Sequence, residues 1–260
     1  MNQRVPILVY HHVYPEGDPE LAAGSRRRAT GIIGEAEFRR QMSYLVAEGW
    51  QVISTTRLVE WLGQGATIPG RAAVLHFDNG WLDTYTVSWP ALHEHGLTAT
   101  CYLISDVTAA ASEDRPVTVS TTTEGMVAKQ GLTWEHAAEL LAEGWEMGAH
   151  TATHPRLAEL YTAAGDAGVI AEIERSHTVY GEALGFVPTH FAYPSGSRSA
   201  QTDALLAPYY RSLRRWERPL PPQGGFTDRD TSPLALECQN IDNTVSFRDF
   251  TRLFEDLQTA

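Results

Sequence analysis

Short apolar runs alternate with longer amphipathic segments along the whole chain. Runs of mainly apolar residues predict strands at 7–10, 50–54, 72–77, 98–104, 146–149 and 189–193. Segments whose apolar residues recur three and four positions apart predict helices at 36–48, 55–62, 83–94, 133–142, 163–184, 200–207 and 247–257. Because strands that alternate with helices imply a parallel sheet, we expect an α/β fold: a distorted (β/α) barrel of about seven parallel strands, in a single domain over residues 1–260.

Two stretches depart from this alternation. Residues 105–130 are rich in Ser, Thr, Asp and Ala and have no clear period, so we expect a long irregular excursion near the functional face. Residues 219–225 are rich in Pro and Gly and predict a loop. Thr133 is the expected N-cap of the helix that follows it.

Polar residues cluster directly after three of the predicted strands. The clusters are His76-Phe77-Asp78-Asn79-Gly80, His150-Thr151-Ala152-Thr153-His154 and Ala192-Tyr193-Pro194-Ser195-Gly196. In a parallel barrel the functional residues lie where the strands end, so these clusters are expected to meet at one edge. His150 and His154, four residues apart, can face one metal ion. Asp78 can act as a general base or as a third ligand, and water polarised by the metal would be a nucleophile near neutral pH.

Each cluster also has a purely structural interpretation. Two histidines four residues apart are often exposed or hydrogen-bonded in a core, and Asp-Asn-Gly after a strand is most often a turn. Tyr-Pro followed by Gly is also common in turns. The combination at three strand ends is what favours a functional site over three unrelated turns.

Composition and charge exclude several classes of function. The net charge of -12 argues against nonspecific nucleic-acid binding, which needs clustered Lys and Arg. The one basic run, Arg26-Arg27-Arg28, is interpreted as a solvated loop. Cys101 and Cys238 lie in no CxxC or Cys/His spacing, so neither a disulfide framework nor a thiolate zinc site is expected.

Neither a secretion signal nor a membrane span is predicted. The apolar run at 7–10 is too short for a signal peptide, and no run reaches the roughly 18 residues that a span needs. The chain is therefore expected to be cytoplasmic, or extracellular if a leader has been removed. The sequence leaves the oligomeric state open.

The polar motifs resemble those of a known family. The order Phe77-Asp78-Asn79-Gly80, then Gly148-Ala149-His150-Thr151-Ala152-Thr153-His154-Pro155, then Phe191-Ala192-Tyr193-Pro194-Ser195-Gly196 is similar to the polysaccharide deacetylases, carbohydrate esterase family 4 of the NodB-homology type. The opening Val9-Tyr10-His11-His12 resembles the branch with the poly-β-1,6-N-acetylglucosamine deacetylases. The resemblance runs from about Val5 to Phe250, and the histidine motif is its most specific part.

The resemblance implies a role for each motif. A distorted (β/α) barrel would hold a divalent metal, zinc in the first place and nickel, cobalt or iron as alternatives. Asp78 matches the catalytic base, and His150 and His154 match the metal-binding histidines. Asn79 stands where the family has a metal-binding Asp. Ser195 stands where a Tyr gives its backbone N–H to the oxyanion hole, a function that survives a change of side chain.

The chain departs from the family pattern at three points. Asn79 offers a carbonyl oxygen without charge, so weaker or altered metal binding is expected. The Arg that orients the base in many members is replaced by Ala192, as in the branch named above. The C-terminal Leu-x-His motif that supplies the general acid is missing from Leu236-Glu237-Cys238-Gln239-Asn240-Ile241-Asp242.

Another group would then have to protonate the leaving amine. His11 or His12, after the first strand, is the first candidate, and His76, His190 and Asp242 follow in that order. His76 and His190 lie inside predicted strands, where a core role competes. Among residues that could shape the substrate site, Trp81 is favoured by its position directly after the first motif, and Tyr193 follows from its place beside Ser195.

Three functions stay open. The first is a metal-dependent deacetylase, an amide hydrolase that removes acetyl groups from an N-acetylated sugar or polysaccharide. The second is a hydrolase of a small cytoplasmic amide, imide or acetylated metabolite on the same scaffold, which the absent leader and Asn79 favour. The third is a carbohydrate-binding homologue without activity, against which the retained Asp78 argues.

Overall fold

Parallel strands form the central sheet of the computed structural model, which describes residues 3–24, 31–121, 125–216 and 225–258. The strand order is β12 (Ser212–Arg214), β11 (His190–Ala192), β10 (Glu146–Ala149), β7 (Thr100–Leu103), β6 (Ala72–Asn79), β2 (Ile7–Tyr10) and β14 (Gln239–Asn240). The short strand β5 (Gln51–Val52) pairs with the first residues of β6. A parallel bridge between Arg214 and Leu236 joins the β12 edge to the segment that leads into β14. The predicted distorted (β/α) barrel of about seven parallel strands is confirmed.

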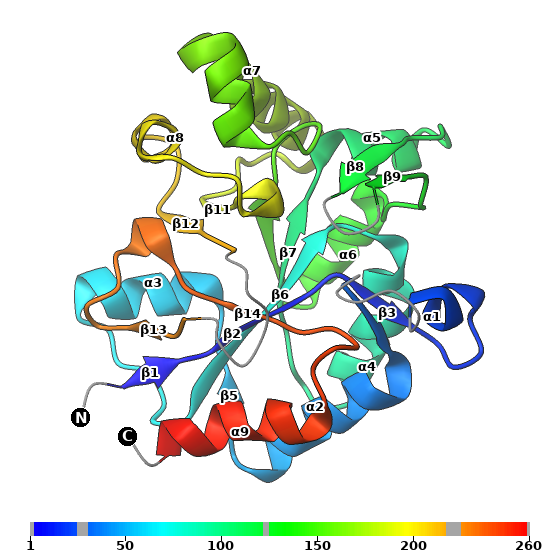
Figure 1. Cartoon of the computed structure of the whole chain (residues 1–260), viewed down its shortest axis with the longest axis vertical. Helices are drawn as coiled ribbons and strands as arrows, with labels where there is room; N and C mark the ends of the chain where they lie inside the picture. The colour runs from blue at the N-terminus through cyan, green and yellow to red at the C-terminus, as the bar shows by residue number, and fades with distance from the viewer. Residues whose placement is uncertain (1–2, 25–30, 122–124, 217–224, 259–260) are drawn as a thin grey trace.

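Helices cover the outside of this sheet (Figure 1). They are α1 (Pro19–Gly24), α2 (Glu35–Ala47), α3 (Thr55–Gln64), α4 (Trp89–His93), α5 (Ser105–Ser112), α6 (Trp134–Ala142), α7 (Leu157–Leu184), α8 (Ala200–Leu206) and α9 (Phe247–Gln258). Phe250, Leu253 and Phe254 of α9 join Phe38 and the other buried residues of α2 in the largest hydrophobic cluster. None of the helices within the described ranges combines the length and apolarity that crossing a membrane requires.

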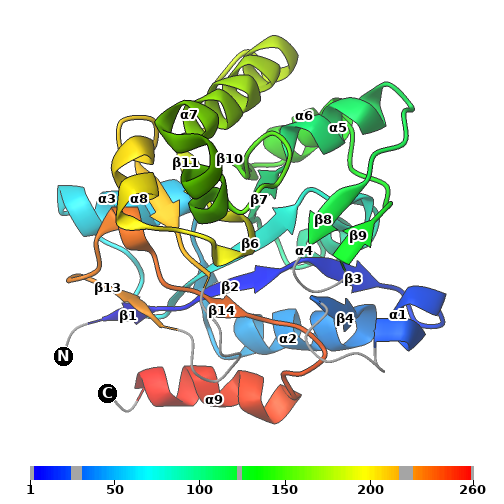
Figure 2. The ribbon, with the colours of Figure 1, turned by 45° about the horizontal axis from the view of Figure 1, so that its top comes forward.

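Three small sheets flank the central one (Figure 2). Strand β1 (Arg4–Val5) pairs with β13 (Thr227–Asp228), β3 (His12–Tyr14) with β4 (Ile32–Gly34), and β8 (Val119–Thr121) with β9 (Gly125–Val127). The last pair is antiparallel and, like α5, lies within residues 105–130. The prediction that this stretch is irregular was therefore wrong for α5 and for the two strands. Its alanine-rich start forms a helix. The two strands have only three paired residues each, which is too short to leave a clear period in the sequence.

Other local predictions met mixed outcomes. Thr133 is the N-cap of α6, where its hydroxyl accepts the N–H of His136. The helix predicted at 83–94 begins with a π-helical turn at Thr84–Ser88. The helix predicted at 163–184 corresponds to the part of α7 that follows a break at Gly165, whose φ of 62° and ψ of -160° are not helical. Strand β12 was not predicted, because Leu213 is its only apolar residue. The Arg26–Arg28 run and most of the loop at 219–225 lie outside the described residues.

Polar side chains fill the lower part of the barrel interior. His76 of β6 contacts the hydroxyl of Thr55 at 2.9 Å. His190 of β11 contacts the hydroxyl of Thr56 at 3.0 Å and that of Ser212 at 2.8 Å. Burial lowers the pKa of His190 to about 4 from the usual 6.5. These two histidines therefore stay neutral inside the fold.

The barrel interior is tightly packed around Tyr102. The Tyr102 ring lies so close to Gly148 that a Cβ at position 148 would stand 2.4 Å from two of its ring carbons. The Arg214 guanidinium lies over the Tyr102 ring, 5.3 Å from its centroid. Gly148 is thus required because Tyr102 fills the space where a side chain would project.

We predict that Gly148→Ala destabilises the fold. A methyl group at this position forces Tyr102 to move, and overpacking of this kind costs about 1–3 kcal/mol. Gly181→Ala in α7 is the matched control, since a Cβ there meets nothing within 4 Å. The control should stabilise the helix by about 0.5–1 kcal/mol. Urea unfolding of both variants measures these changes, and equal effects in the two would contradict the packing argument.

We also predict a loss of stability on acidification that depends on His190. The pKa of His190 is lower in the folded chain than in the unfolded one, so the unfolded chain binds the proton first as the pH falls. The free energy of unfolding should fall between pH 6.5 and about 4, by about 1.4 kcal/mol per pH unit for this residue. Urea unfolding of His190→Gln at a series of pH values should show a shallower slope. An unchanged slope would contradict the assignment.

Candidate active site

The predicted motifs meet at the carboxyl edge of the sheet. Asp78 and Asn79 end β6, where they pair in register with Tyr102 and Leu103 of β7. His150 follows β10, whose last residue pairs with the same Leu103. Three strands that are far apart in sequence thereby place their polar residues side by side.

Asp78 forms a buried ion pair that the sequence did not reveal. Its Oδ2 lies 2.5 Å from a terminal guanidinium nitrogen of Arg214, and the two side chains are 4% and 0% exposed. Burial alone would raise the pKa of Asp78, but the attraction of Arg214, helped by His150 and His11, holds this pKa well below its usual range. Asp78 is therefore a carboxylate at any physiological pH.

The two motif histidines are held in one tautomer. The Nδ1 of His150 lies 2.7 Å from the Ala192 carbonyl, and the Nδ1 of His154 lies 2.9 Å from the Ser120 carbonyl. A carbonyl only accepts, so each Nδ1 carries the hydrogen and each Nε2 keeps a free lone pair. Burial lowers the pKa of His150 to about 3 and also lowers the pKa of His154. The rings, 4.9 Å apart between centroids, are thus neutral and suited to bind a metal.

The loop that carries these histidines is fixed from α7. Glu172 accepts the backbone N–H of Ala152 at 3.0 Å and that of Thr153 at 3.1 Å. Thr151 accepts the N–H of His154 at 2.9 Å. Thr151 and His154 both have positive φ, at 66° and 65°. Glu172, which the sequence analysis missed, therefore stabilises a strained turn that aims both rings.

Asp78 and Asn79 each leave one oxygen atom without a partner. The Oδ1 of Asn79 and the Oδ1 of Asp78 are buried and have no hydrogen-bond partner among the described residues. Such atoms are rare in a native core unless a ligand, ion or water satisfies them. The amide oxygen of Asn79 and the Nε2 atoms of His150 and His154 are of the nitrogen and oxygen types that bind zinc. Within the described ranges no three His, Cys, Asp or Glu side chains are arranged to hold a metal ion.

The two histidines after β2 diverge. The Nε2 of His11 lies 3.8 Å from Oδ2 of Asp78, and burial lowers the pKa of His11. His12 points elsewhere: its Nδ1 contacts Asp83 at 2.9 Å, and its ring stacks on Trp81 at 5.3 Å between centroids. The prediction of His12 as a catalytic residue is therefore corrected, because His12 lies in β3 and its ring contacts Asp83 and Trp81. His11 remains the candidate.

The other proposed proton donors are engaged elsewhere. His76 and His190 lie in the lower layer of the barrel interior, where threonine and serine hydroxyls contact them. Asp242 accepts the N–H of Thr244 at 2.9 Å and that of Gly31 at 3.3 Å, and so holds its own loop. These contacts favour structural roles for all three.

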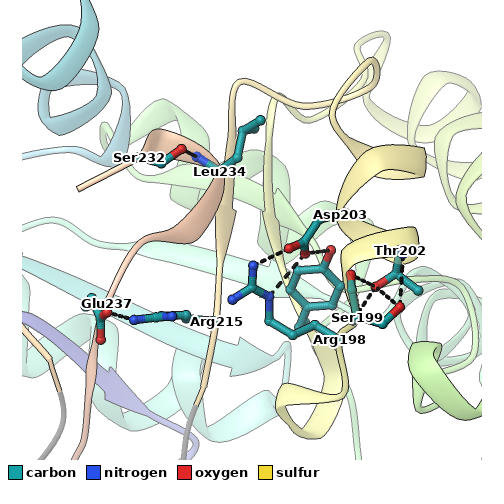
Figure 3. Close-up of polar contacts among 9 residues, drawn as sticks. Arg198, Ser199, Thr202, Asp203, Arg215, Ser232, Leu234 and Glu237 are labelled. Carbon is teal, nitrogen blue, oxygen red and sulfur yellow. Dashed lines mark hydrogen bonds and ion pairs between the residues drawn. The ribbon is translucent and has the colours of Figure 1, made fainter. Parts of the chain in front are cut away.

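Two of the predicted substrate residues are core residues instead. Trp81 is 1% exposed and packs in a small cluster with Ile104, Val107 and Val119. Tyr193 is equally buried, and its hydroxyl donates to Asp203 at 2.7 Å. Figure 3 shows the surroundings of Asp203, which also binds Arg198 at the start of α8. Neither ring can therefore act as a sugar platform in this conformation.

Ser195 and His154 line the same cavity. The φ of Ser195 is 53°, in the left-handed region. Ser120, Arg156 and Glu159 also line this cavity, whose volume is about 530 Å³. The role of the Ser195 backbone N–H in an oxyanion hole stays a prediction.

Comparisons with known proteins agree with this arrangement. The family profile described as polysaccharide deacetylase matches residues 65–209, a range that includes Asp78, Asn79 and both motif histidines. The curated relative YxkH of Bacillus subtilis, whose name assigns it to polysaccharide deacetylases, is 23% identical over 154 residues. That alignment covers 59% of this chain and spans less than half, 44%, of the relative.

Solved structures share the fold over nearly the whole chain. The Streptococcus pyogenes deacetylase PplD, solved with acetate, has a TM-score of 0.78 at 21% identity, covering 97% of this chain and 99% of its own. IcaB from Ammonifex degensii has a TM-score of 0.71 at 19% identity, with coverages of 99% and 98%. A de-N-acetylase from Aggregatibacter actinomycetemcomitans reaches 0.78 at 16% identity, with coverages of 96% and 99%.

At such identities these structures establish the common fold, whereas the family profile spans more than half of the sequence. The chain therefore belongs to the polysaccharide deacetylase family.

Proposed function

We propose that this protein is a metal-dependent deacetylase that removes the acetyl group from an N-acetylated sugar or polysaccharide. The observation that carries the proposal is the ionised Asp78 beside two neutral imidazoles whose Nε2 atoms are free. A buried carboxylate next to a metal-binding pair is the arrangement that activates water for attack on an amide.

The residues present would divide the reaction among them. A divalent ion, zinc in the first place, held by His150, His154 and Asn79 would supply Lewis-acid polarisation of the acetamide carbonyl. Asp78 would accept a proton from the attacking water. The proton that Asp78 accepts would pass through His11 to the nitrogen of the leaving amine, and the Ser195 N–H would stabilise the negative charge on the carbonyl oxygen. The products are acetate and a free amine.

The cavity beside His154 supports a sugar substrate. Its volume of about 530 Å³ lies within the range of small-molecule sites. Ser120, Thr121, Arg156 and Glu159 contribute polar groups that can hydrogen-bond hydroxyl groups, and Pro155, Leu160 and Ala163 contribute apolar surface that suits the face of a sugar ring. We therefore favour an acetylated sugar unit over a small apolar amide.

Acetate release from N-acetylglucosamine oligomers tests this proposal. Loading with zinc should give turnover, and removal of the metal by a chelator should abolish it until zinc is restored. Asp78→Asn should lower kcat by about 10²–10⁴-fold, because it removes the general base. His12→Gln is the control and should stay within about threefold of the parent, since His12 faces away from Asp78. Full turnover in thoroughly metal-stripped protein would contradict the proposal.

A second prediction concerns the unusual ligand. Asn79→Asp adds a negative charge at contact distance from the bound ion, and such a charge contributes several kcal/mol of attraction near a protein surface. We expect zinc affinity to rise at least about tenfold, measured by calorimetric titration. The backbone should accept the change, because Asp tolerates the positive φ of 77° at this position. An affinity equal to that of the parent would show that residue 79 does not contact the ion.

A further inference from the structure

Arg214 occupies a position that the sequence pattern would not assign to an active site. It ends β12, it is completely buried, and one terminal nitrogen lies 2.5 Å from Oδ2 of Asp78. Strand β12 pairs in parallel register with β11, so that Arg214 lies directly opposite Ala192. Ala192 is the position at which the resemblance places the arginine that orients the base in many family members.

The contacts of Arg214 do not resemble those of a structural arginine. Its other terminal nitrogen reaches only the Cys238 sulfur, at 4.0 Å, and its Nε has no hydrogen-bond partner among the described residues. A buried guanidinium with unused donors is unfavourable, and replacement of such ion pairs by apolar side chains is often neutral or stabilising. A role in folding alone therefore explains this residue poorly.

We propose that Arg214 is the residue that positions Asp78. It orients this carboxylate from β12, because Ala192 on β11 has no side chain long enough to do so. The inference rests on the proposed function, in which Asp78 is the general base. Arg214 binds Oδ2 and leaves Oδ1, the buried atom without a hydrogen-bond partner, to face the reacting water.

The surroundings of Arg214 fix it in the required place. Its guanidinium lies over the Tyr102 ring, which in turn packs against Gly148 just before the histidine motif. Hydrogen bonds from Leu236 to Leu213 at 2.9 Å and from Arg215 to Leu236 at 3.1 Å hold the end of β12. The contacts among Arg214, Tyr102 and Gly148 therefore connect the orientation of Asp78 to the strand that precedes His150.

The test compares substitutions at position 214 with relocation of the arginine. Arg214→Met keeps most of the volume and removes the charge, and Arg214→Lys keeps the charge and loses the planar fork. We expect kcat for acetate release from N-acetylglucosamine oligomers to fall on the order of 10²-fold in Arg214→Met, with KM within about threefold. Arg214→Lys should recover part of this loss. Thermal unfolding confirms that each variant is folded.

The decisive variant is the double substitution Ala192→Arg with Arg214→Ala. Paired residues on neighbouring parallel strands lie about 4.8 Å apart and project to the same face, so an arginine at 192 can reach the same carboxylate. We expect the double variant to regain at least about tenfold of the kcat lost in Arg214→Ala. Ala192→Arg alone is the control and should gain nothing, because Arg214 already binds Asp78.

The outcomes separate this inference from the proposed function. A zinc-loaded parent protein that releases no acetate would overturn the function and the positioning role with it. An active parent whose Arg214→Met variant keeps kcat within about threefold would overturn the positioning role alone. So would a folded double variant that is as slow as Arg214→Ala, or a loss confined to KM.

Discussion

The ion pair between Asp78 and Arg214 is the interaction on which the rest of the site depends. Both side chains are removed from water, so each charge is tolerable only because of the other, and loss of one partner would leave an uncompensated charge in the core. The pair also joins β6, which has neighbours on both sides, to the edge strand β12. The contact that keeps Asp78 ionised therefore runs across the inside of the half-barrel, and the packing of Tyr102 on Gly148 gives Arg214 its place.

Backbone strain is concentrated where the functional atoms lie. Five non-glycine residues among those described have positive φ, and four of them are Asn79, Thr151, His154 and Ser195. Each lies at or shortly after the end of a strand that runs into the site, where the chain must turn sharply. Such conformations persist only where surrounding contacts compensate for them. For the histidine turn, the bonds from Glu172 and Thr151 provide that compensation.

The sequence predicted the fold well and the site in part, for different physical reasons. Buried strands and amphipathic helices leave strong periodic patterns, and motifs at strand ends could be assigned to one edge of the sheet. Arg214 was missed because its strand has only one apolar residue, so the sequence pattern there is typical of a basic loop. Glu172 was missed because its partners are backbone N–H groups, which sequence does not display. His12, Trp81 and Tyr193 were placed by their nearness to motifs in the sequence, but such nearness does not fix the direction in which a side chain points.

Charge balance links two of the departures from the family pattern, at positions 79 and 192. An aspartate at position 79 would place two carboxylates side by side, one of them free to attract the metal and the other paired with Arg214. With Asn79 the first coordination sphere is neutral, and the charge of Asp78 is already balanced by Arg214. The site as a whole then carries no excess negative charge to attract a cation. Metal binding would rest on the directed Nε2 lone pairs of the two histidines and on the buried Oδ1 of Asn79, so precise geometry would have to replace electrostatic attraction.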